Sequence, residues 1–113
     1  MTKIYLRYLR IALAVDIFNK NSEIIDTITL NLLNVIAVHH FDGKPLTVSQ
    51  CIALKKIASP ATLHRKLDEL REAGLIEQVF EGKNRRTKYL VPTKLADAYF
   101  AKLSKAITSA VKI

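Results

Sequence analysis

The chain has 113 residues, which is enough for one domain with a hydrophobic core but hardly for two. Its 18 lysine and arginine residues outnumber 10 acidic residues, and the formal net charge of +8 favours a polyanionic partner. A single cysteine excludes an intrachain disulfide and a zinc site built from cysteines, so a reducing cytoplasm is the expected location.

Residues 4–18 are predicted to form a helix that is apolar over most of its circumference. Two apolar stripes at helical spacing run along this helix. One consists of Ile4, Tyr8, Ile11 and Val15, and the other of Leu6, Leu9, Leu13 and Ile17. Arg7, Arg10 and Asp16 interrupt the apolar run and exclude a membrane span. A helix of this kind must be covered on two sides, so the pattern predicts a partner surface.

A second helix is predicted over residues 22–41. Its core candidates are Ile25, Ile28, Leu32, Val35 and Ile36. His39 and His40 are adjacent, and neighbouring helical residues diverge by about 100°, so the two imidazoles do not converge on one metal ion.

A short third helix is expected to begin at Val48. Thr47 can cap it, and Gln50 lies three residues after the cap, as in a capping box. The predicted helix has about two to three turns. The next helix follows directly, because Ser59 is a good cap residue and Pro60 suits the first helical position.

The helix that begins at Pro60 is predicted to end at Gly74, which can adopt the left-handed conformation of a helix C-terminus. Its apolar stripe consists of Leu63, Leu67 and Leu70. Rotation of the helix about this stripe directs Ala61, Arg65, Asp68 and Glu72 outward, with Thr62 and His64 on the flanks.

Two strands are predicted after Gly74, over Leu75 to Phe80 and Tyr89 to Val91, because both runs are rich in β-branched or aromatic residues. Four basic residues lie in the tip between them: Lys83, Arg85, Arg86 and Lys88. Pro92 stops the second strand, and Thr93 can cap a last helix over residues 94–112. The apolar positions of that helix are Leu95, Tyr99, Leu103, Ala106, Ile107 and Ala110.

The basic charge is concentrated in the middle of the chain. Residues 1–43 have four basic and four acidic residues, residues 44–88 have ten and five, and residues 89–113 have four and one. The excess therefore begins with the pair of short helices. The alternative explanation of the basic excess is a charged surface that only keeps the protein soluble. The clustering of basic residues at the hairpin tip argues against this alternative.

The run from Ser59 to Leu67, followed by residues 73–76, 84–88 and Thr93, resembles the DNA-binding core of the MarR (multiple antibiotic resistance regulator) winged-helix family. This resemblance implies that the helix from Ser59 enters the major groove and that the hairpin, or wing, reaches a minor groove or the phosphates. By matching position, Ser59, Thr62, Arg65 and Lys66 have the groove role. Arg85 and Arg86 have the wing role.

Arg65 is the residue expected to contact a base, because its planar guanidinium matches the hydrogen-bond acceptors of guanine. The alternative role for Arg65 is an intrahelical ion pair with Glu69 or Asp68. Ser59 and Thr62 are equally well explained as caps, and Lys66 as a phosphate contact or a solvated side chain. For the wing, the alternative is a charged tip that discourages edge pairing. The predicted DNA-contacting residues are Ser59, Ala61, Thr62, His64, Arg65, Lys66, Lys83, Asn84, Arg85, Arg86 and Lys88.

The expected fold is mainly α with a small β-hairpin (α+β), as one winged helix-turn-helix domain over residues 1–113. Residues 1–43 and 94–113 are expected to supply dimerisation helices, and residues 44–93 the DNA-binding core. The predicted function is sequence-specific binding of double-stranded DNA by a homodimeric, cytoplasmic transcriptional regulator, a repressor. The alternative is a winged-helix adaptor, or a plasmid or phage replication module, that binds protein partners or origin DNA.

No phosphate-cradling loop, nucleophile elbow or internal repeat is present in the sequence. Asp68 and Glu72 lie four residues apart but have no partner histidine, so they are expected to form a solvated face. We therefore predict no enzymatic activity, no cofactor and no metal site. The sequence does not decide whether a small molecule or an oxidant controls binding.

Overall fold

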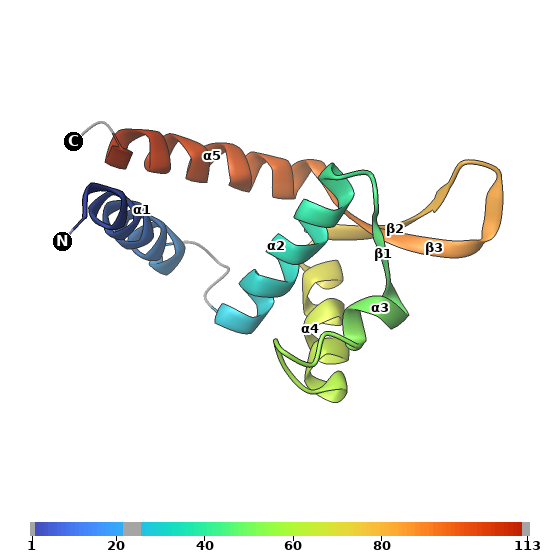
Figure 1. Ribbon diagram of the computed structural model, residues 1–113. Helices are drawn as coiled ribbons and strands as arrows, with labels where there is room; N and C mark the ends of the chain where they lie inside the picture. The colour runs from blue at the N-terminus through green and yellow to red at the C-terminus, as the bar shows by residue number, and fades with distance from the viewer. Residues whose placement is uncertain (1, 22–25, 112–113) are drawn as a thin grey trace. The chain divides into compact units, whose positions relative to one another are not determined.

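The computed structural model describes residues 2–21 and 26–111, shown as a ribbon in Figure 1. The elements in chain order are α1 (Lys3–Lys20), α2 (Thr27–Phe41), β1 (Leu46–Thr47), α3 (Val48–Ile52), α4 (Pro60–Glu72), β2 (Ile76–Glu81), β3 (Asn84–Pro92) and α5 (Lys94–Val111). The fold is thus mainly helical with a small antiparallel sheet, as the sequence predicts. Within the described ranges, no helix is long and apolar enough to cross a membrane.

The described residues form two compact units. One consists of α1 and of α5 from Ala98 onward, and the other of Asp26–Asp97. α2, which the sequence pattern groups with the first helix for dimerisation, belongs to this second unit. The reason is that α2 presents fully buried Leu32, Leu33 and Ile36 to the second unit and contributes to its core.

The start of α2 is fixed by Asp26. Its carboxylate oxygen Oδ1 accepts hydrogen bonds from the backbone N–H groups of Ile28 (2.8 Å) and Thr29 (3.1 Å), which is N-terminal capping. The earlier part of the predicted helix, residues 22–25 with the core candidate Ile25, lies outside the described residues.

Thr47 and Gln50 form the predicted capping box at the start of α3. The Thr47 amide donates to Gln50 Oε1 at 2.9 Å, and the Gln50 amide donates to Thr47 Oγ1 at 3.2 Å. The predicted length of two to three turns is wrong, because α3 has five residues. The Leu54 amide bonds to the carbonyl three residues back, on Cys51, so the backbone leaves the α-helical pattern there.

Local chemistry explains both ends of α4. Ser59 caps its start, with Pro60 at the first helical position, and Leu63, Leu67 and Leu70 are buried as predicted. Gly74 has a φ of +76°. Its amide bonds to the Arg71 carbonyl and the next amide, on Leu75, bonds to the Leu70 carbonyl, each at 3.0 Å, which completes a Schellman motif.

Replacement of Gly74 by alanine is expected to lower the free energy of unfolding by about 1–2 kcal/mol, the cost of a left-handed backbone for a residue with a Cβ. A methyl group would meet no close atom, since the nearest is Leu95 Cδ2 at 3.8 Å, so the cost is conformational. Urea denaturation measures the difference. Gly74→Asn should lose less, because asparagine tolerates this conformation, and equal losses for both variants would contradict the explanation.

The sheet has three antiparallel strands in the order β1–β3–β2. The predicted hairpin is present, but β3 begins at Asn84 and not at Tyr89 as predicted, and it continues to Pro92. The first strand was not predicted: Leu46 pairs with Leu90 and Thr47 with Tyr89. Two residues are too few to show a period of two in the sequence. Figure 1 shows the β2–β3 hairpin extending away from α2, α3 and α4.

Candidate nucleic-acid interface

The two hydroxyl groups at the start of α4 are engaged with each other. Ser59 Oγ accepts from the Thr62 amide at 3.3 Å and donates to Thr62 Oγ1 at 3.0 Å. Ser59 therefore acts as the cap of α4 in this structure, and the Thr62 hydroxyl is held by it. Ala61, between them, is exposed, so the first turn of α4 offers solvent a small side chain and an uncharged hydroxyl pair.

Arg65 is exposed on α4 and makes no hydrogen bond or ion pair with any residue of ranges 2–21 and 26–111. The carboxylates that could neutralise it have other partners. Glu69 pairs with Lys66 at 3.2 Å. Asp68 lies 3.5 Å from His64 Nδ1 and 3.9 Å from Arg71. The alternative of an intrahelical pair for Arg65 is thus not adopted, and its guanidinium is available to an external acceptor.

Lys66 is turned the other way, toward α2. Its Nζ lies 2.7 Å from Asp26 Oδ2 and 3.2 Å from Glu69 Oε2, and the side chain is only 12% exposed. The hydrogen bond to Asp26, and then that to Glu69, raises the pKa of the Lys66 ammonium above its ordinary value. The Lys66 side chain therefore does not share the exposed face of Arg65. The phosphate contact predicted for Lys66 does not fit this geometry.

The contact with Lys66 also makes the stabilisation by Asp26 depend on pH. The hydrogen bond from Lys66, followed by that from the Thr29 amide, lowers the pKa of the Asp26 carboxyl. A carboxyl with a depressed folded pKa stabilises the fold above its unfolded value of about 3.9. This stabilisation is lost as the pH falls through the lower, folded value.

Asp26→Asn is therefore expected to be less stable than the wild type at neutral pH and to approach it in acid. Loss of the charged partner should cost about 1 kcal/mol or less, since the pair is partly exposed to solvent. Urea denaturation between pH 2 and 7 tests this, with the difference closing below about pH 4. A difference that does not vary with pH would contradict it.

The hairpin tip combines a tight turn with a bulge. Glu81 pairs with Asn84 across Gly82 and Lys83, and Gly82 has a φ of +58°, as the first central residue of a type II′ turn has. The preceding pair is Phe80 with Lys88. From that pair to the Glu81–Asn84 pair, β2 moves along by one residue and β3 by four. The three extra residues of β3 are Arg85, Arg86 and Thr87. A bulge re-aims side chains and increases the local twist, and both arginines lie within this one.

Two of the hairpin cations lie over one aromatic ring. Arg85 Cζ is 5.5 Å and Lys88 Nζ is 5.7 Å from the centroid of the Phe80 ring, within the range of cation–π attraction. Phe80 is 38% exposed, so the three side chains form a surface cluster. Lys83 and Arg86 are also exposed, whereas the Asn84 side chain lies outside the described part of the chain.

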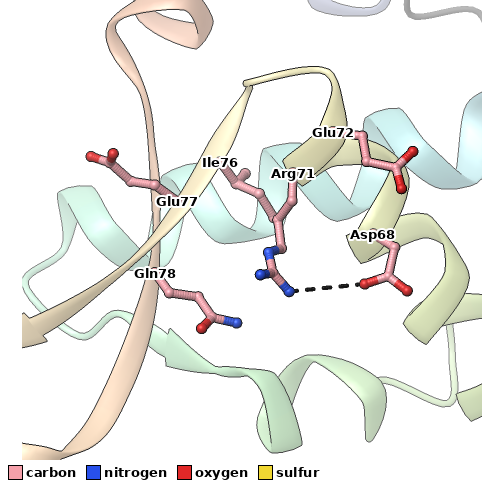
Figure 2. A pocket seen from close by; sticks show the side chains of 6 residues that line it. All are labelled: Asp68, Arg71, Glu72, Ile76, Glu77 and Gln78. Carbon is pink, nitrogen blue, oxygen red and sulfur yellow. Dashed lines mark ion pairs between the residues drawn. The ribbon is translucent and has the colours of Figure 1, made fainter.

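The C-terminal half of α4 is acidic. A shallow hollow of about 570 Å³ separates it from β2, and its lining residues are Asp68, Arg71, Glu72, Ile76, Glu77 and Gln78. Figure 2 shows Arg71 and Asp68 directed toward each other, with an ion pair of 3.9 Å between them. With three carboxylates and one guanidinium, the lining repels phosphate. The basic residues predicted to contact DNA are divided between α4 and the hairpin, which Figure 1 shows as separate parts of one unit.

Two members of this arrangement were missed from the sequence, namely Asp26 and Phe80. Asp26 was placed inside the second helix, although an aspartate directly before Thr27 and an apolar run is an N-cap signal. Phe80 was treated only as a strand residue. Cys51 is buried, and burial raises the pKa of its thiol to about 11, so the reactive thiolate is scarce at neutral pH.

The other unit exposes apolar surface. No residue of α1 is buried, and the exposed fractions are 82% for Ile4, 62% for Leu13 and 60% for Ile17. Contact with α5 is made by Phe18, whose ring lies 5.7 Å from that of Tyr99. The Tyr99 hydroxyl also donates to Asn19 Oδ1. The described part of this unit thus leaves most of α1 exposed or only half-buried.

No protein-family model and no curated protein matches this chain. Among solved structures, it is similar to the crystal structure of RV1404 from Mycobacterium tuberculosis, with a TM-score of 0.64. The similarity covers 96% of this chain and 68% of that chain at 16% sequence identity. At that identity, the similarity shows a shared fold.

Proposed function

We propose that this chain is a winged helix-turn-helix protein that binds double-stranded DNA with sequence preference as a homodimer, and that it acts in the cytoplasm as a transcriptional repressor. The observation that supports this most strongly is Arg65. Its guanidinium is exposed and has no acceptor among the described residues, and it lies in the N-terminal half of a capped helix, in the same unit as a basic hairpin.

In this proposal α4 is the recognition helix. Its N-terminal half has the positive end of the helix dipole, which favours phosphate, and the exposed carboxylates of α4, Asp68, Glu69 and Glu72, all lie farther along. The helix would therefore enter the major groove with its first turns. The planar fork of Arg65 would donate to the O6 and N7 atoms of guanine.

The β2–β3 hairpin is the wing. Its bulge groups Arg85 and Arg86, and stacking on Phe80 restrains the Arg85 guanidinium. A restrained arginine loses less side-chain entropy on binding, and narrow minor grooves attract arginine. Lys88 and Lys83 add positive charge at the same tip and suit the phosphates on either side of the groove.

The proposed dimer uses α1. Several large apolar side chains are exposed along α1, an amount of apolar surface that favours an interaction site, and closed twofold dimers are the commonest assembly. Two recognition helices related by a twofold axis would contact pseudo-palindromic half-sites about one DNA turn apart. Occupation of a promoter by such a dimer represses transcription without any chemical step.

Titration of a random-sequence duplex at two salt concentrations, followed by fluorescence anisotropy, tests the role of the wing in DNA binding. Wild-type affinity should fall steeply with salt. Arg85→Gln with Arg86→Gln should lower the slope of log K against log salt by about 0.9 for each phosphate that the variant no longer neutralises. The matched control, Lys102→Gln with Lys105→Gln on the exposed side of α5, should leave the slope unchanged.

If the wild type binds no duplex even at low salt, the DNA proposal is contradicted. The exposed apolar surface of α1 would then favour the protein-adaptor function. If both double variants lower the slope equally, the wing does not touch the DNA, and binding reflects only the total charge.

A further inference from the structure

One ion pair joins the proposed recognition helix to the start of α2 from 40 residues away. Lys66, in the middle of α4, directs its ammonium to Asp26 at 2.7 Å, and the lysine side chain is 12% exposed. Most of the lysine stem is therefore packed within the unit. Glu69, one turn later on α4, holds the same ammonium at 3.2 Å.

Asp26 is itself held in place. Oδ1 accepts from two backbone N–H groups of α2, those of Ile28 and Thr29, while Oδ2 accepts from Lys66. Because the carboxylate is fixed to the N-terminus of α2, its bond to Lys66 restrains the rotation of α4 about its own axis. Arg65 and Lys66 are neighbours, and neighbouring helical side chains point about 100° apart. A Lys66 that faces α2 therefore leaves Arg65 facing outward.

We propose that the Asp26–Lys66 pair is a positioning contact, which sets the rotation of α4 against α2 so that Arg65 faces the DNA, and that Lys66 does not bind phosphate. This inference rests on the proposed DNA-binding function and adds two positioning residues to it. Neither residue touches the nucleic acid; both act through Arg65.

The two possible roles of Lys66 predict opposite effects of the same substitution. Asp26→Asn keeps the N-cap of α2, because asparagine caps as well as aspartate does, but it removes the negative charge. If Lys66 bound phosphate, this change would release it and strengthen DNA binding. If the pair positions α4, the same change weakens binding although the protein becomes more positive.

The experiment compares four proteins by anisotropy titration with a duplex that the wild type prefers: wild type, Asp26→Asn, Lys66→Arg and Glu72→Gln. Asp26→Asn should bind about fivefold more weakly or worse, the usual lower range of coupling between linked sites. Lys66→Arg preserves the ion pair and should bind nearly as the wild type does. Glu72→Gln makes the same charge change on α4 away from the Asp26–Lys66 pair, so it should bind equally or slightly more tightly.

The salt dependence of Lys66→Met gives an independent readout. Removal of a phosphate-binding lysine lowers the slope of log K against log salt by about 0.9, whereas removal of a positioning lysine lowers affinity at an unchanged slope. Tighter binding by Asp26→Asn, or a reduced slope for Lys66→Met, would overturn the proposal.

Residual dipolar couplings of backbone amides, measured without DNA, test the same ion pair separately from function. The orientation of α4 relative to α2 should differ between the wild type and Asp26→Asn. Unchanged couplings would overturn the proposal even if binding changes. If the wild type itself binds no duplex, the proposed function fails, and the couplings still decide whether the pair fixes α4.

Discussion

The double substitution Leu13→Glu with Ile17→Glu is expected to abolish the homodimer. It should also weaken binding to a duplex with two half-sites by about 10²–10⁴-fold. Among the described residues, Leu13 and Ile17 of α1 are 62% and 60% exposed. In a dimer, two carboxylates per chain would have to lose their hydration against an apolar surface. The binding of one half-site would no longer make the second binding event intramolecular, and this change accounts for the large effect.

Sedimentation equilibrium at micromolar concentration measures the change of assembly, and anisotropy titration measures the change of affinity. The matched control is Val38→Glu with Phe41→Glu, which makes the same chemical change at exposed apolar positions of α2 (59% and 90% exposed). The control should stay dimeric. A wild-type protein that sediments as a monomer, or a dimer that survives both pairs of substitutions, would contradict the assignment of the interface to α1.

Arg65→Ala is expected to cost about 1–3 kcal/mol of binding free energy on the preferred duplex, and to relax the preference at one base-pair position in each half-site. The effect should be smaller on random DNA, because a base contact contributes only where the matching base is present. This pattern differs from that of a wing variant, which should weaken binding almost equally on all sequences.

Two substitutions make the Arg65 test specific. Arg65→Lys keeps the charge but lacks the planar fork, so it should retain affinity for random DNA and lose the sequence preference. Arg71→Ala removes the same charge from the acidic half of α4, where Arg71 pairs with Asp68, and should have little effect. If Arg65→Ala and Arg71→Ala weaken binding equally on every duplex, Arg65 is not the base-reading residue.

The features predicted correctly from the sequence depend on residues a few positions apart. The Thr47–Gln50 capping box, the Ser59–Pro60 start of α4 and the left-handed helix end at Gly74 are each complete within six residues. Their hydrogen bonds form between near neighbours, so the residue types alone specify them. The buried leucine stripe of α4 was predictable for the same reason, since its helical period lies within one element.

The features that were missed depend on contacts between distant residues. The first strand exists because Leu46 pairs with Leu90, and Asp26 has its role because Lys66 lies beside it after folding. The bulge at Arg85 is likewise a property of the register between two strands. Of the predicted interface, the exposure of Arg65 agrees with the sequence pattern. The inward direction of Lys66 could not be predicted, because charge and helical position alone are compatible with either direction.

Selection of duplexes from a random-sequence pool by the wild-type protein, followed by sequencing of the bound fraction, tests the central claim most directly. A sequence-specific homodimer predicts enrichment of a pseudo-palindrome whose half-sites are about one helical turn apart and contain a guanine, the base that Arg65 is expected to contact. The enriched duplex should remain bound at a salt concentration that releases random DNA. A bound fraction with the same composition as the starting pool, at any salt concentration, would contradict the claim.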